Sequence, residues 1–193
     1  MSREVAGWPA LDAVRLADLL LDEPDIEYRF IACELVNHHR TALGSLDSRG
    51  VEHFGRGIDS WGAVDTFACY VSGPAWRHGQ IPDRLVHGWA RSRDRWWRRA
   101  ALVSTVPLNN RARGGSGDTD RTLAVASMLV ADRDDMVVKA LSWALRELSK
   151  RDAAAVQAFL AANAAGLAPR VIREVTNKLE AGVKTPRRKS DRG

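Results

Sequence analysis

The 193-residue chain has only two cysteines, Cys33 and Cys69. Two thiols cannot build a disulfide framework, a four-thiolate zinc site or a four-cysteine iron–sulfur cluster. No apolar run approaches the ~20 residues of a membrane-spanning helix. The N-terminus also lacks the charged-then-apolar pattern of a secretory signal. These absences predict a chain without membrane partners in a reduced, cytoplasmic setting.

Several motifs that are typical of particular enzyme classes are also absent from the sequence. There is no C-x-x-C, no H-E-x-x-H, no G-x-x-x-x-G-K-[ST] and no G-x-S-x-G. The five histidines are scattered, and the adjacent His38 and His39 would diverge on a helix. The sequence therefore argues against a metallo-hydrolase, an NTPase and a serine hydrolase. We expect no metal and no cofactor.

The chain shows no strand pattern, because alternation of apolar and polar residues with turn dipeptides is absent. It contains 45% hydrophobic and 27% charged residues, which is typical of a globular protein. Helical spacing of apolar residues instead predicts eight to nine helices and an all-α fold. The predicted helices cover residues 9–23, 24–36, 61–71 behind Ser60 as N-cap, 82–90, 94–106, 119–131, 135–150, 153–163 and 169–181, with a loop over 109–117.

Charge is distributed unevenly along the chain. Residues 1–90 carry a net charge of −5 and residues 91–193 a net charge of +10. Of the 29 basic residues, 24 are arginine, whose planar guanidinium binds phosphate groups in a bidentate manner. The bias favours a nucleic-acid partner, although a GC-rich genome also produces an arginine preference.

A weak repeat runs through the helices. The segment that begins at Arg99 matches the segment that begins at Lys139, and Arg29 precedes Arg99 by close to two such intervals. Helix pairs that repeat at about 40 residues are typical of HEAT-type solenoids, which stack into an array with one concave face. We therefore predict one α-solenoid domain of HEAT-like repeats over residues 1–181. An irregular helical bundle is the alternative, and the basic residues 182–193 are predicted to form a disordered tail.

Three groups of residues could carry chemistry. Trp61 and Asp65 are spaced i, i+4, so the indole and the carboxylate share a helix face in an otherwise apolar stretch. Trp143 and Arg146 share a face in the same way. Indoles and guanidinium groups alternate in Arg95-Trp-Trp-Arg-Arg99, where they could meet bases, sugars and phosphates. Each group also has a structural interpretation: an ion-paired Asp65, a core Trp143, and a solvated basic helix face.

Taken in order, three blocks of the sequence resemble one family. The blocks are Ser60-Trp-Gly-Ala-Val-Asp-Thr-Phe67, Trp96-Trp-Arg-Arg-Ala-Ala-Leu-Val-Ser104 and Val137-Val-Lys-Ala-Leu-Ser-Trp-Ala-Leu-Arg-Glu-Leu-Ser-Lys150. They resemble the bacterial DNA alkylation repair family, the AlkD-like HEAT-repeat DNA glycosylases, over about residues 24–181. The loop 109–117 is longer and richer in arginine and glycine than the resemblance predicts, and residues 1–23 stand where the family has a further repeat.

The resemblance implies an enzyme that removes N3- and N7-alkylated purines from duplex DNA, without a metal and as a monomer. It implies that Asp65 is the catalytic carboxylate, that Trp61 and Trp143 flank the damaged nucleotide, and that Arg99 belongs to the same site. The DNA-binding residues expected beside them are Arg95, Trp96, Arg98, Lys139 and Arg146. No lysine in these blocks could serve as a Schiff-base nucleophile, so we expect a monofunctional glycosylase.

Two other classes of function stay open at this stage. A non-catalytic HEAT-like module that binds DNA structures or a protein would use Asp65 as a structural ion-pair partner. A catalytic Asp65 should instead be ionised and open to the DNA-binding face. An RNA-binding helical repeat would need a stacked aromatic residue in each repeat, which Trp61, Trp96 or Trp97, and Trp143 supply only loosely.

Overall fold

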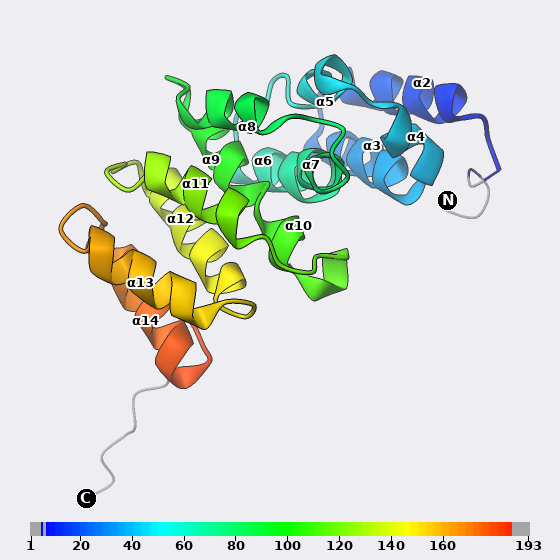
Figure 1. The fold of residues 1–193 in the computed structure, drawn as a ribbon. Coiled ribbons are helices and arrows are strands. Elements are labelled where there is room, and N and C mark those ends of the chain that lie inside the picture. The colour runs from blue at the N-terminus through cyan, green and yellow to red at the C-terminus, as the bar shows by residue number, and fades with distance from the viewer. Residues whose placement is uncertain (1–4, 6, 187–193) are drawn as a thin grey trace, which may run out of the picture.

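The computed structural model describes residue 5 and residues 7–186, and over these residues it contains helices and no strand. The helices follow one another in an extended array, with the first and last helices at opposite ends (Figure 1). The all-α prediction is confirmed, and the packing is consistent with a solenoid of helical repeats.

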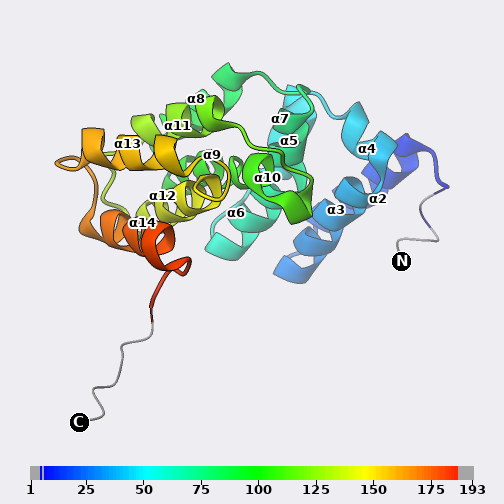
Figure 2. The ribbon, with the colours of Figure 1, turned by 60° about the horizontal axis from the view of Figure 1, so that its bottom comes forward.

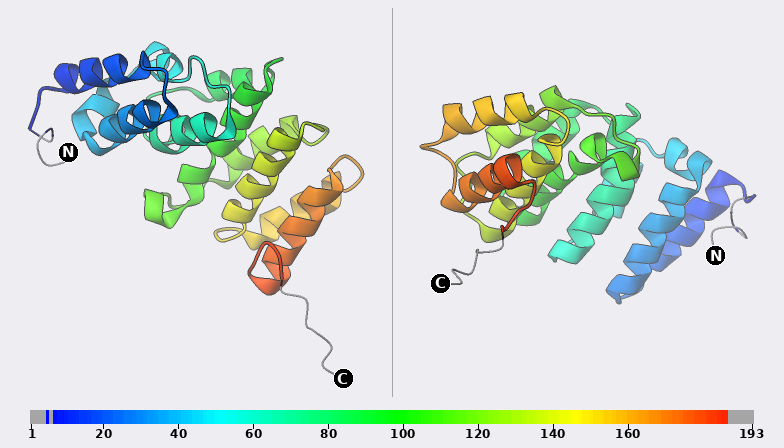
Figure 3. Two further views of the ribbon diagram at one scale, coloured as in Figure 1. Left: turned by 180° about the vertical axis from the view of Figure 1, so that it is seen from behind. Right: turned by 90° about the horizontal axis from the view of Figure 1, so that it is seen from below.

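The helices form two layers. In the first layer each helix contacts the next, in the order α3 (Ile26–His38), α6 (Trp61–Phe67), α9 (Arg95–Val103), α12 (Asp135–Leu148) and α14 (Pro169–Ala181). The second layer contains α2 (Ala10–Leu21), α8 (Asp83–Ala90), α11 (Thr119–Met128) and α13 (Ala153–Asn163), and Figure 2 shows the last three side by side above α12 and α14. Viewed from behind and from below, α3, α6, α12 and α14 keep this order along the array (Figure 3).

Helix α9 is the centre of the packed interior. Every residue from Arg99 to Asn109, which includes α10 (Val106–Asn109), is buried. The flanking helices α6, α8 and α12 all pack against α9. The apolar burial that stabilises the array is therefore concentrated where α6, α8 and α12 pack against α9.

Polar bonds between neighbouring repeats recur at nearly constant spacing. Ser72 and Ser104 share a buried hydrogen bond of 2.6 Å across 32 residues. Ser142 donates to Glu174 at 2.6 Å, also across 32 residues. Arg98 pairs with Asp132, 34 residues later, at 2.7 Å. These bonds fix the register of one repeat on the next. The first-layer helices begin at residues 26, 61, 95, 135 and 169, so the predicted interval of 40 residues holds from α9 to α12, and the other steps are 34 or 35 residues.

Most predicted helix ends are close to the observed ones, but the segment after Trp61 is not. Ser60 caps α6 as predicted, by accepting from the Ala63 amide. The predicted end at Gly73-Pro74 is wrong, because the helix continues through a π-helix (Ala68–Ser72) into α7 (Gly73–Arg77). Pro74 is the second residue of α7 and directly follows the junction with the π-helix.

Several other short helices were not predicted. They include α4 (Arg40–Ser45), α5 (Ser48–Phe54) and the 3₁₀-helix η2 (Arg111–Arg113), which lies inside the predicted loop. None of them is long enough to display a helical period in the sequence. Within the predicted tail, Lys184 contacts Glu174 at 3.5 Å, and residues 187–193 lie outside the described part of the chain.

Among the described residues, no helix has the length and apolar character needed to cross a membrane. The same part of the chain brings together no group of three or more histidine, cysteine, aspartate or glutamate side chains that could hold a metal ion.

Candidate active site

The solvent side of α6 carries the candidate reactive residues. Trp61, at the first position of the helix, is 63% exposed. Asp65 follows one turn later, and 19% of its side chain remains exposed. The i, i+4 spacing therefore does place the indole and the carboxylate along one face, with the carboxylate set deeper than the indole.

Arg99 of α9 holds the Asp65 carboxylate. Its Nε donates to Oδ1 at 2.8 Å and its Nη2 donates to Oδ2 at 2.7 Å, which is a bidentate pair. The remaining Nη1 donates to the carbonyl of Met136, the second residue of α12, at 2.6 Å. The Arg99 side chain is only 7% exposed. It links three successive helices of the first layer and fixes the carboxylate in one orientation.

Two opposing effects act on the Asp65 carboxyl group. Burial raises its pKa above the ordinary value of 3.8, because a charged carboxylate loses water there. The hydrogen bonds and the charge of Arg99 oppose that rise. The next turn of the helix brings Cys69, whose thiol has a pKa raised to about 12 by burial and is therefore neutral at pH 7. Asp65 therefore stays the candidate reactive group on this face of the helix.

The accessible face of α12 carries the other predicted residues. Met136, Lys139, Trp143 and Arg146 follow one another at helical spacing, and each is at least partly exposed. Trp143 is half-buried against the core, unlike Trp61. Lys139 pairs with Asp135 at 2.6 Å, and Arg146 donates through Nε to Ser142 at 3.2 Å. Both cations keep exposed surface and could meet a phosphate group.

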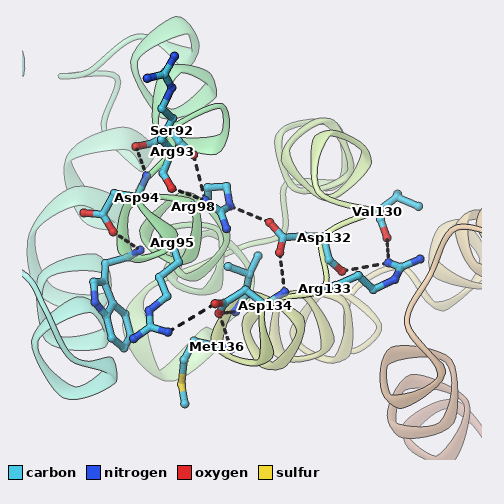
Figure 4. A network of polar contacts seen from close by, with 12 residues as sticks. Ser92, Arg93, Asp94, Arg95, Arg98, Val130, Asp132, Arg133, Asp134 and Met136 are labelled. Carbon is cyan, nitrogen blue, oxygen red and sulfur yellow. Dashed lines mark hydrogen bonds and ion pairs between the residues drawn. The ribbon is translucent and has the colours of Figure 1, made fainter.

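The predicted residues at the start of α9 divide into two kinds (Figure 4). Arg98 is engaged within the protein: its Nε bonds to Asp132 at 2.7 Å and its Nη1 bonds to the carbonyls of Ser92 and Arg93. Arg95 is half exposed; it stacks on Trp96 and approaches Asp134 at 3.6 Å. Arg95 and Trp96 can reach a ligand from these positions, whereas Arg98 joins two repeats. The predicted contact of Arg98 with DNA stays a prediction.

Sequence reasoning did not single out Tyr70 or Arg113. Tyr70 lies in the π-helix after α6, and the Arg113 guanidinium lies over its ring at 4.9 Å from the centroid. Both line a pocket of about 490 Å³ that also includes Cys69, one turn beyond Asp65. The arginine-rich composition of residues 109–117 was the available signal, but the contact depends on the stacking of the repeats.

A comparison with known protein families gives a match over most of the chain. A family model described as DNA alkylation repair enzyme matches residues 4–179. No curated protein matches the chain. The family match covers all of the candidate residues above and the first-layer helices, except for the last two residues of α14.

Proposed function

The chain belongs to the DNA alkylation repair enzyme family, and on that premise we propose that it is a monofunctional glycosylase that excises N3- and N7-alkylated purines from duplex DNA. One observation carries the proposal. A carboxylate, Asp65, is held bidentately by a buried arginine, stays partly accessible and follows an exposed indole, Trp61, on one helix face.

This arrangement suits a substrate that already carries a positive charge. An N3- or N7-alkylpurine is a good leaving group, so the enzyme need not protonate it. The bond from C1′ to the base nitrogen breaks with its electron pair moving to the purine, which becomes neutral. Asp65 stabilises the cationic sugar that remains and accepts the proton of the water that attacks C1′. The products are the free alkylpurine and an abasic site.

The neighbouring groups would support these steps. Arg99 keeps the carboxylate oriented, and it can remain in place throughout the reaction because it is buried. The Trp61 indole can lie against the cationic sugar or base. Lys139 and Arg146 on α12, together with Arg95 on α9, offer partly exposed cations to the DNA backbone.

The bidentate pair also favours a second candidate function, a non-catalytic module that binds DNA. In that case Asp65 serves only to satisfy the buried guanidinium of Arg99. The two candidates differ in whether loss of the carboxylate charge removes a reaction or only lowers stability.

The test is single-turnover release of 7-methylguanine from a methylated duplex by the wild type and by Asp65→Asn. We expect excision to fall at least about a hundredfold, as for loss of one transition-state charge contact. Asparagine keeps one acceptor for Arg99 but leaves its buried charge without a counter-charge, so we expect a folded variant whose stability falls by about 3–5 kcal/mol. Its affinity for an undamaged duplex should stay close to that of the wild type.

Asp59→Asn is the matched control, because Asp59 is an exposed carboxylate just before the same helix. It should excise at the wild-type rate. Equal excision by the wild type and Asp65→Asn would remove Asp65 from the mechanism. Duplex binding without any release by the wild type would favour the binding module.

A further inference from the structure

The loop from Asn109 to Asp118, between α10 and α11, is held rigidly by arginines of neighbouring repeats. Arg77 donates through Nη1 to the carbonyls of Pro107 and Arg113. Arg151 donates to the carbonyl of Asn109 at 2.7 Å and to that of Gly115 at 2.9 Å. A loop anchored from both sides presents its side chains in fixed positions.

Local bonds reinforce this anchoring. Asn109 Oδ1 accepts from the Asp118 amide at 3.0 Å, which closes the loop on itself. Asn110 Oδ1 accepts from the Arg113 amide at 3.2 Å, within η2. A Cβ on Gly115 would lie 2.6 Å from the backbone of Leu108, so only glycine allows the loop to pack this closely.

The loop displays two cations that the fold leaves available. Among the described residues, neither Arg111 nor Arg113 takes part in an ion pair. Arg111 is exposed, and Arg113 is oriented by its stack on Tyr70. A stacked guanidinium loses little conformational freedom when it binds, because its position is already restricted.

Residues 110–113 separate three neighbouring pockets of about 640, 490 and 340 Å³. Arg113 lines the first two pockets and Arg111 lines the third. The acidic residues of these pockets are Glu34 and Glu147, and Lys150 neutralises Glu147 at 2.7 Å. The pocket of about 490 Å³ joins this loop to Cys69, which follows Asp65 by one helical turn.

We propose that the rigid 109–118 loop is a DNA-backbone contact site, in which Arg111 and Arg113 bind phosphate groups away from the damaged base. The inference rests on the proposed function for its partner, since the ligand is the same duplex. The loop contributes affinity that is independent of the lesion, and it takes no part in breaking the glycosidic bond.

The experiment compares the wild type with the double variant Arg111→Ser/Arg113→Ser on an undamaged 20-base-pair duplex at several salt concentrations. We expect the double variant to bind about tenfold more weakly, and the negative slope of log K against log[salt] to become shallower by about 1 to 2. At saturating enzyme, its single-turnover excision of 7-methylguanine should equal that of the wild type.

Two further variants separate charge from structure. Arg111→Lys/Arg113→Lys keeps both charges and should retain most of the salt slope. Arg49→Ser/Arg84→Ser removes two exposed arginines from α5 and α8, and it should bind like the wild type. Circular dichroism of each variant checks that the helices persist.

The outcomes are distinct from those of the Asp65 test. An unchanged affinity and slope in the double serine variant would overturn the loop site even if excision is found. A wild type that does not bind the duplex would overturn it as well. Weaker binding in that variant without any excision by the wild type would keep the loop site and reject the glycosylase.

Discussion

At the level of single side chains, burial raises the pKa of Asp65 and Arg99 lowers it. The pH dependence of excision can separate these two effects. The proposed reaction needs its carboxylate form, whereas burial favours the neutral form and raises its pKa above 3.8. We therefore expect the acidic limb of the single-turnover excision rate to have its midpoint above 3.8. Spontaneous base loss from the same duplex without enzyme is subtracted at each pH.

Acid unfolding caused by protonation of Asp65 would not explain a loss of excision rate at low pH. A carboxyl whose pKa is raised in the folded chain binds its proton more tightly there than in the unfolded chain. Its contribution to stability therefore falls as the pH rises through that window, and it is fully present at lower pH. The circular dichroism signal, recorded at the same pH values, should persist where the rate has fallen.

Arg99→Gln supplies the control for this profile. The charge and hydrogen bonds of Arg99 hold the pKa of Asp65 down, so the midpoint should move further upward in the variant. A wild-type midpoint at 3.8, or one that Arg99→Gln does not move, would show that Asp65 is not the group that titrates. Because Arg99 is buried, the salt dependence of DNA binding should not change.

The sequence was sufficient to place Trp61 and Asp65 on one face, because that relation depends only on helical spacing. It also allowed that Asp65 pairs with an arginine. The family resemblance put Arg99 at the same site, but helical spacing alone could not choose it as the partner, because the two residues are 34 positions apart and meet only when α6 packs on α9. The exposure of Trp61 and the half-burial of Trp143 likewise depend on which helices cover them.

At the level of elements, the π-helix between α6 and α7 depends on a glycine. Gly73 has ordinary helical angles, φ −65° and ψ −48°, so its backbone does not require glycine. A Cβ there would lie 2.7 Å from the Ala68 carbonyl oxygen, the Ser104 carbonyl oxygen and Pro107 Cγ. The glycine is needed for space, where α7 crosses the end of α9 and the start of α10.

Gly73→Ala should therefore destabilise the protein, although alanine is the better helix former by about 1 kcal/mol. We expect a net loss of about 1–3 kcal/mol from the crowded contact, measured by urea denaturation. Gly88→Ala is the matched control, since Gly88 is helical, is exposed and has no heavy atom within 4 Å of its ideal Cβ. That change should stabilise by up to about 1 kcal/mol. Equal effects of the two substitutions would contradict the packing argument.

This segment also shows where helix prediction from sequence stops. Gly73-Pro74 is a common terminating pair, and the sequence contains no signal for the extra residue in a π turn. The long helices α13 and α14, by contrast, were predicted with their observed bounds, because Asp152 caps one and Pro169 begins the other. Capping residues and apolar spacing are local signals, whereas the π turn is stabilised by helices that pack against it.

At the level of the whole molecule, the array is held together by contacts between neighbouring repeats. In such an arrangement stability is close to a sum of repeat and interface terms, and a terminal repeat can open alone. Among the first-layer helices that the structure describes, α14 is the last, and it packs against α12. The order of the repeats was predictable from helix spacing, whereas the bonds that join them were not, because they link residues far apart in the sequence, such as Ser142 and Glu174.

A buried hydrogen bond between Ser142 and Glu174 joins α12 to α14. Its removal tests whether the last repeat can unfold independently of the others. Glu174 accepts from Ser142 at 2.6 Å, and Ser142 in turn accepts from Arg146.

Glu174→Ala leaves the serine hydroxyl without its acceptor, which should cost about 1–3 kcal/mol. We expect that cost to appear as faster amide hydrogen exchange in α13 and α14, while α3 and α6 keep their protection. Glu180→Ala, an exposed change on the same helix, should alter neither region. Uniform loss of protection along the chain would mean that the repeats unfold as one unit, and the position of Arg146 would then depend on the whole array rather than on its neighbouring repeat.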